Sequence, residues 1–156
     1  MTNRLIAIDI DNRGLAPPTP EMDQERKVAI FDLLEDNSFA IPRAAEFPGP
    51  YQLMLALRDG RLVFDVHNEK GAKVAEFHLS LGPFRQVVKD YTQICESYFE
   101  AVKVMPPSQI EAIDMARRGI HNEGARVLQE RLSGKAEVDA ATARRLFSLI
   151  CVVQWA

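Results

Sequence analysis

The sequence is poor in the features that define several common protein classes. Two cysteines, Cys95 and Cys151, stand far apart among apolar residues, and no CxxC or Cys/His spacing links them. Zinc sites and disulfide-rich secreted scaffolds need closely spaced or numerous cysteines, so we expect buried free thiols in a reducing compartment. The first ten residues lack the apolar core of a signal peptide, and no apolar run approaches the ~20 residues that cross a bilayer. We therefore expect a cytoplasmic protein with no membrane segment.

A strong excess of charge of one sign is also absent. The chain carries 19 Lys and Arg against 22 Asp and Glu, a formal net charge of −3. Nucleic-acid binding usually needs a basic face, so a nucleic acid is not an expected partner. Glycine-rich nucleotide-binding loops, the GxSxG elbow and the HExxH zinc motif are missing as well. The sequence therefore predicts no cofactor and identifies no catalytic residue.

The composition is that of an ordinary globular protein, with 47% hydrophobic and 26% charged residues. A chain of 156 residues suits one domain, here residues 1–156, and can bury a sizeable core without a disulfide or a metal. Residues 42–50 carry three prolines and a glycine and are expected to form an irregular loop.

A three-stranded antiparallel meander is the clearest structural prediction. Asp59-Gly60 suits a two-residue hairpin turn because such turns need positive φ, and Lys70-Gly71 is expected to be the second turn. A shift of one residue would bring polar side chains into the buried face, which fixes the register. The two turns pair Leu57 with Leu62, Leu55 with Phe64, Leu53 with Val66, Phe64 with Phe77, and Leu62 with Leu79. The alternating segment Leu5–Ile10 is a candidate for an additional strand, with Ile6, Ile8 and Ile10 on one face.

Four helices complete the predicted α+β fold. They are expected to begin at Thr19-Pro20, Phe84, a Ser108–Glu111 capping box, and Asp139. The first should bury Val28, Phe31 and Leu34. The second and third are joined by Met105-Pro106-Pro107, and we expect them to form an antiparallel hairpin that packs on the apolar face of the meander.

The outer face of the meander gathers a first cluster of chemically active residues. The predicted register places Asp65 opposite Glu76, with His67 and His78 on the same face. Neighbouring carboxylates repel each other, and a shared proton or a divalent metal would relieve that repulsion. These four residues are the candidate metal ligands of a small metal-assisted hydrolase, the alternative functional hypothesis. A solvated sheet face explains the same residues without any function.

A second cluster lies in the middle of the helix that begins near Ser108. Its candidate ligand-binding residues are Asp114, Arg117, Arg118, His121 and Asn122. Gly119 and Gly124 weaken the helix, which suggests that something approaches its backbone closely. Arginines can grip a phosphate or a carboxylate through two parallel hydrogen bonds. The leading hypothesis is a non-catalytic binding or regulatory module that contacts a protein or an anionic ligand through the Arg117–Glu123 region. A charged surface helix is the alternative.

Two further features concern partners. Arg144-Arg145 on the last helix, together with Arg85, Lys89 and Arg126, could form a basic face, although a solvated face balanced by acids has the same composition. Trp155 stands one residue from the end and could fill a core position or an interface. A third hypothesis is a homodimer with Trp155 and the helical hairpin at its interface.

Four stretches of the chain carry a resemblance to a known family. They are ERKVAIFDLLEDNSF, LSLGPFRQVVKDYTQICESYFEA, PSQIEAIDMARRGIHNEGA and TARRLFSLICVVQW, and together they span most of the length. The chain resembles an uncharacterised family of small alphaproteobacterial proteins. The resemblance implies a bacterial, cytoplasmic setting, and it implies no activity and no catalytic residues.

Overall fold

The computed structural model describes residues 3–15, 17–42 and 49–155, without the side chains of residues 154 and 155. The elements in this part of the chain are β1 (Leu5–Ile10), α1 (Pro20–Glu35), β2 (Phe39–Ala40), β3 (Tyr51–Arg58), β4 (Arg61–Asn68), β5 (Lys73–Ser80), α2 (Gly82–Val104), α3 (Pro107–Leu132), β6 (Glu137–Val138) and α4 (Ala140–Trp155). The predicted α+β class with four helices is confirmed. Most of the proline-rich loop and the side chain of Trp155 lie outside the described residues.

The main sheet has the strand order β1-β3-β4-β5, and β1 runs parallel to β3 while the other pairs are antiparallel. Every cross-strand pair predicted from the two turns is present. Asp59 and Gly60 have φ values of 53° and 71°, as the predicted turn requires. The pairing of β1 is irregular between Leu5 and Ala7, and Ile6 is 40% exposed. The expectation that Ile6 shares a buried face with Ile8 and Ile10 was therefore wrong.

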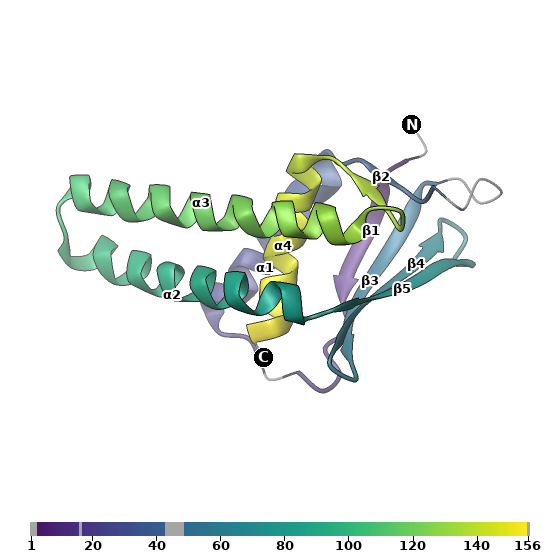
Figure 1. Ribbon diagram of the computed structural model, residues 1–156, viewed down its shortest axis with the longest axis horizontal. Coiled ribbons are helices and arrows are strands. Elements are labelled where there is room, and N and C mark those ends of the chain that lie inside the picture. Colours follow the sequence, from purple (N-terminus) through teal and green to yellow (C-terminus); the bar gives the residue numbers. More distant parts are fainter. Residues whose placement is uncertain (1–2, 16, 43–48, 156) are drawn as a thin grey trace.

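The helices lie on one side of the main sheet, and the other side carries no helix (Figure 1). α4 crosses the α2–α3 hairpin and packs against both α1 and α3, and the far end of the hairpin projects away from the sheet (Figure 1). The end of the hairpin nearest the sheet shares one core with β3 and β4, through Phe84, Val88, Leu128, Leu132, Leu55 and Phe64. Strands β2 and β6 form a separate two-stranded sheet that the sequence did not predict.

Two local predictions about the helices were wrong. α1 begins as predicted, with the Thr19 hydroxyl accepting a hydrogen bond from the Met22 amide at 3.2 Å. However, Val28 and Phe31 are 47% and 65% exposed, and α1 buries Ala29 and Leu33 instead. In α3 the helix starts at Pro107 with no side-chain cap, so the predicted capping box does not form.

Close packing of α3 against α4 explains one of the two helix glycines. A Cβ atom at Gly124 would lie 2.2–2.5 Å from ring atoms of Phe147, which is buried in α4. Nothing in the described part of the chain lies within 4 Å of a Cβ at Gly119. The predicted close approach is therefore confirmed for Gly124, whereas no other described part of this chain approaches Gly119, and an approach there by a ligand or a second subunit stays a prediction. None of the helices in the described residues is long and apolar enough to cross a membrane.

Candidate functional site

The outer face of the sheet carries the first predicted cluster. Asp65 of β4 lies opposite Glu76 of β5, as the turn register predicted. His67 Nδ1 is 3.7 Å from Asp65 Oδ1, and His78 Nε2 is 2.9 Å from Glu76 Oε2. The cluster therefore consists of two histidine–carboxylate pairs on neighbouring strands.

Lys73 supplies the positive charge that the two carboxylates share. A register shift in β4 pairs His67 with Lys73, whose Nζ lies 2.5 Å from Glu76 Oε1 and 3.7 Å from Asp65 Oδ1. Hydrogen bonds from Lys73 first, and then from His78, lower the pKa of Glu76 to about 2. A lysine thus relieves the carboxylate repulsion. No group of three or more His, Cys, Asp or Glu side chains among the described residues could hold a metal ion, so nothing supports the hydrolase hypothesis.

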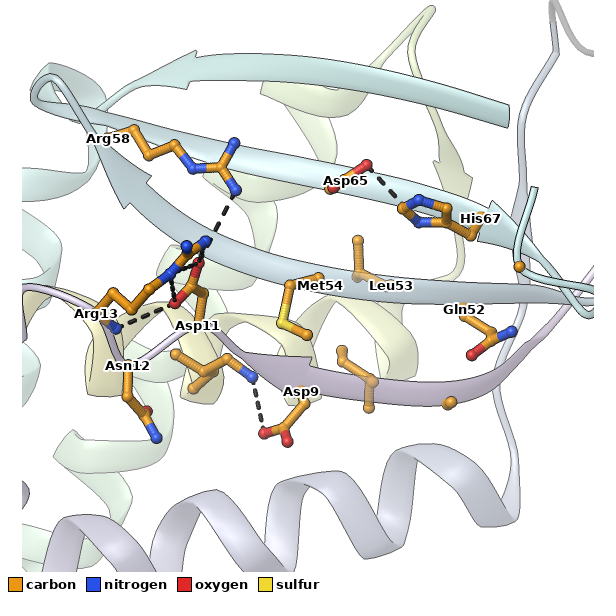
Figure 2. Close-up of a pocket in the computed structure, with 14 residues that line it drawn as sticks. Asp9, Asp11, Asn12, Arg13, Gln52, Leu53, Met54, Arg58, Asp65 and His67 are labelled. Carbon is orange, nitrogen blue, oxygen red and sulfur yellow. Dashed lines mark hydrogen bonds and ion pairs between the residues drawn. The ribbon is translucent and has the colours of Figure 1, made fainter. Parts of the chain in front are cut away.

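A cavity of about 780 Å³ opens on the same face, over β1, β3 and β4 (Figure 2). Its acidic side chains contact basic ones. Asp11 accepts hydrogen bonds from the Arg13 side chain at 2.6 to 3.0 Å and lies 3.9 Å from Arg58. The hydrogen bonds from Arg13 are the main cause that lowers the pKa of Asp11 to about 2. Asp9 lies 3.9 Å from Arg26 of α1. The outer-face cavity is wide, and each of its carboxylates lies within 4.0 Å of a basic side chain, although the buried Asp65 Oδ1 accepts no hydrogen bond from the described residues.

The second predicted cluster lies where the hairpin meets α1 and α4. A cavity of about 440 Å³, here called the arginine cavity, is lined by Tyr91, Arg117, Arg118, His121, Asn122 and Arg144. An adjoining cavity of about 470 Å³, the α1 cavity, shares Arg117, His121 and Arg144 with it and is bounded on its other side by α1. The structure therefore brings four of the five predicted ligand-binding residues to one cavity.

The fifth predicted residue, Asp114, lines neither cavity and instead holds two of the arginines. Its Oδ1 is 2.5 Å from Arg117 Nη2, and its Oδ2 is 2.6 Å from Arg118 Nη2. The Arg117 guanidinium also lies over the Tyr98 ring, 4.5 Å from its centroid. Arg144 has no hydrogen bond or ion pair through its guanidinium with any residue that the structure describes. Three guanidiniums and no carboxylate therefore stand among the described residues that line the arginine cavity.

His121 forms part of the wall that the two cavities share. Its ring packs between those of Tyr91 and Phe147, at centroid distances of 5.0 and 5.2 Å, and its Nε2 is 2.7 Å from Ser148 Oγ. Burial first, and then the charges of Arg117 and a second nearby arginine, lower the pKa of His121 to about 4. At neutral pH the imidazole is uncharged, so it offers hydrogen bonding without adding charge to the wall.

Glu25 of α1 lies on the other side of the α1 cavity. Tyr91 Oη donates a hydrogen bond to Glu25 Oε1 at 2.9 Å. Burial raises the pKa of Glu25, and the Tyr91 hydrogen bond and the charge of Arg117 oppose that rise only in part. No basic side chain of the described residues lies within 4.0 Å of the Glu25 carboxylate. The α1 cavity thus contains a half-buried acid with no ion-pair partner within 4.0 Å among the described residues.

The two cysteines do not add reactive thiolates to this region. Both are buried and free, as the sequence predicted. Burial is the main cause that raises the pKa of Cys95 to about 11 and that of Cys151 well above its usual range. Since the thiolate is the nucleophilic form, neither side chain is suited to thiol catalysis near neutral pH.

Sequence reasoning missed Glu25, Tyr91 and Ser148, and it noted Arg144 only as part of a basic face. These residues lie on three helices that are far apart in the chain, so no local pattern links them. The one available signal was Tyr91, because a phenol in an apolar stripe needs a hydrogen-bond partner when it is buried. Glu123, at the end of the predicted Arg117–Glu123 region, pairs with Arg126 at 2.6 Å and lines neither cavity.

The family model and the similar proteins found by comparison belong to the same family. The model of an uncharacterised protein family, UPF0262, matches residues 2–156. A UPF0262 protein from Cereibacter sphaeroides is 72% identical over 156 residues, which covers 98% of this chain and 99% of that protein. UPF0262 proteins from Dinoroseobacter shibae and Paracoccus denitrificans are each 71% identical, with 98% and 97% of this chain and 98% and 95% of those proteins covered. No solved structure matches the chain. The chain therefore belongs to the uncharacterised protein family UPF0262, as the alphaproteobacterial resemblance predicted.

Proposed function

We propose that this protein is a non-catalytic binding or regulatory module that binds a small anionic ligand in the arginine cavity. The observation that carries the proposal is the lining of that cavity, which has Arg117, Arg118 and Arg144 and no carboxylate among its described residues. Asp114, outside the cavity, is the one carboxylate that pairs with Arg117 and Arg118 among the described residues, so the three guanidiniums keep a positive excess that an anion would neutralise. The Arg144 guanidinium is free of described partners and is therefore available for a ligand.

The other residues of the wall support an anion that also accepts hydrogen bonds. Asp114 and the Tyr98 ring hold Arg117 in place, so little side-chain entropy is lost when it binds. Asn122 lines the same cavity and can donate hydrogen bonds through its side-chain amide, while the neutral His121 adds no charge to the wall. Carboxylate and phosphate groups match this donor set, because both accept two parallel hydrogen bonds from a guanidinium.

Calorimetric titration with inorganic phosphate and with hexanoate at fixed low ionic strength tests the proposal. We expect wild-type protein to bind at least one of them, and Arg144→Gln to weaken that binding by about tenfold or more, the effect of one lost charge-assisted contact. Arg126→Gln is the matched control, since Arg126 pairs with Glu123 and Glu130 on the exposed side of α3. The proposal fails if neither anion binds, or if Arg126→Gln weakens binding as much as Arg144→Gln.

We propose in addition that the projecting end of the hairpin contacts a second copy of the chain. Three apolar residues there are 41% to 80% exposed, namely Val102, Val104 and Met105. Contiguous exposed apolar side chains of this kind commonly mark an interface. Light scattering should give a mass that rises with protein concentration, and a constant monomer mass would exclude the dimer. The participation of Trp155 in this contact stays a prediction.

We also propose that the protein is cytoplasmic. The two buried free thiols support this location, because a reducing compartment keeps thiols unpaired.

A further inference from the structure

Charged side chains of both signs line the α1 cavity. Glu25 of α1 and Arg144 of α4 have no ion-pair partner within 4.0 Å among the described residues, and the acids Glu21 and Asp32 at the same cavity have none either. Glu25 of α1 has Tyr91 Oη as its only described hydrogen-bond partner, at 2.9 Å. Arg144 of α4 has no described side-chain partner. The two other arginines of this cavity are satisfied elsewhere, since Arg117 pairs with Asp114 at 2.5 Å and Arg145 Nη1 donates to the Asp36 carbonyl at 2.9 Å.

The separation of these two groups is informative. Glu25 and Arg144 line one cavity of about 470 Å³ but are not within the 4.0 Å of an ion pair. A direct ion pair would have lowered the cost of burying the Glu25 carboxylate, and the structure leaves space between the two groups instead. Val28 and Phe99 line the same cavity and offer it apolar surface. The exposed Val28, which contradicted the predicted stripe of α1, therefore has a place in this cavity.

We propose that the ligand is zwitterionic, with its anionic group on Arg144 and Arg117, a cationic group on Glu25, and an apolar linker along Val28 and Phe99. The proposal rests on the proposed anion binding and specifies its ligand class. A cation at Glu25 supplies the counter-ion that the described residues lack, and the shared wall of the two cavities lets the anionic end reach the arginines. Phosphate or carboxylate suits the anionic end equally, and a primary ammonium suits the cationic end.

Matched probe pairs separate the two ends of the ligand. The ω-amino acids with four, six and eight carbons are compared in calorimetric titrations with the corresponding carboxylates, which lack only the amine. We expect at least one amino acid to bind about tenfold more tightly than its matched carboxylate, the effect of one charge-assisted contact. Inorganic phosphate serves as the reference anion, and the matched alkylamines should bind more weakly than the amino acids.

Substitution of Glu25 locates the cationic end. Glu25→Gln should remove the advantage of the amino acid. The carboxylate and phosphate should still bind, and no more weakly than to the wild-type protein, because the substitution takes a negative charge out of the cavity. Asp23→Asn is the matched control on α1, because Asp23 pairs with Lys27 at 3.0 Å and lines neither cavity. Thermal unfolding of each variant establishes that it is folded. The probe pairs with the wild-type protein test whether the ligand is zwitterionic, and they need no variant.

The possible outcomes distinguish this inference from the proposed function. If carboxylates or phosphate bind and no amino acid binds more tightly than its partner, the zwitterion is excluded and anion binding stands. If the advantage exists but survives Glu25→Gln, or disappears equally in Asp23→Asn, the placement of the cation at Glu25 is wrong. If no probe binds to the wild-type protein, both the inference and the proposed function fail.

Discussion

The outer sheet face and the helical cavities contain the same kinds of side chain but differ in how those side chains are paired. On the sheet, Lys73 lies between Asp65 and Glu76, and Arg13 chelates Asp11. Between the helices, Arg144 and Glu25 have no counter-ion among the described residues. The sheet face therefore behaves as a neutralised polar surface. The contrast teaches that the pairing of charges, more than their presence, identifies the better binding site.

The pairing differs because of how each region is built. Neighbours on a sheet face come from adjacent strands at a fixed spacing, so opposite charges meet directly across the ladder. The cavity walls come from four separate helices, whose positions are set by core contacts such as Gly124 against Phe147. Charged groups on those walls stay where the packing places them, and a gap between them is preserved.

Gly124→Ala should have the largest effect on stability, because it disrupts the packing of α3 against α4 that positions the walls of the helical cavities. The new methyl group would lie 2.2–2.5 Å from ring atoms of Phe147, and overpacking at that position should lower the free energy of unfolding by about 3 kcal/mol. Urea unfolding measures the change. Gly119→Ala is the matched control, with no described atom within 4 Å of its Cβ, and should raise stability by about 0.5–1 kcal/mol. Equal effects of the two substitutions would contradict the close approach.

His121 should make stability depend on pH. Its pKa is lowered from 6.5 to about 4 in the folded protein, so its contribution is complete above pH 6.5 and is lost as the pH falls toward 4. Between pH 7 and pH 4 the wild-type protein should lose about 2 kcal/mol more than His121→Gln, allowing for partial solvent screening. Urea unfolding at several pH values tests this. Parallel profiles for the two proteins would show that the imidazole titrates normally.

Tyr91→Phe should have a smaller effect on the same wall. It removes the hydrogen bond to Glu25, and at pH 8, where the carboxylate is charged, the free energy of unfolding should fall by about 1 kcal/mol. The pKa of Glu25 is raised, and the cost should shrink at pH 4 because a protonated carboxyl needs the bond less. Thermal unfolding at both pH values measures it. Tyr98→Phe is the control, and an equal, pH-independent loss in both variants would argue against the role of Glu25.

Glu76→Gln should have the smallest effect, because it removes an exposed ion pair. The pKa of Glu76 is lowered to about 2 by Lys73 and then His78, so its contribution is present above the unfolded value of 4.5 and is lost as the pH falls toward 2. The variant should be slightly less stable than the wild-type protein at pH 7, and the difference should vanish at pH 2 and weaken in 1 M salt. Equal loss at every pH would show that packing, and not charge, is responsible.

The predictability of each element follows from how local its determinants are. The meander was predicted down to its residue pairs, because the Asp59-Gly60 and Lys70-Gly71 turns and the alternation of apolar residues are short-range signals. The predicted buried face of α1 was wrong, because Val28 and Phe31 have the apolar character of core residues and only the position of α4 shows that they are exposed. Ser108 does not cap α3 because the N-cap residue is Pro106, two positions earlier, and Ser108 already lies in the first helical turn.

The residues of the candidate site also differ in how far local sequence predicted them. The sequence by itself indicated that Arg117, Arg118, His121 and Asn122, the candidate ligand-binding residues on α3, lie close together, since they fall within two turns of one helix. Only the tertiary structure decided that Glu25, Tyr91, Arg144 and Ser148 join them, because those residues reach the cavity from three other helices. It also decided that Lys73 neutralises the sheet cluster, through a register shift that no local pattern revealed. Local backbone conformation is determined by neighbouring residues, whereas charge pairing between distant elements depends on how the whole core packs.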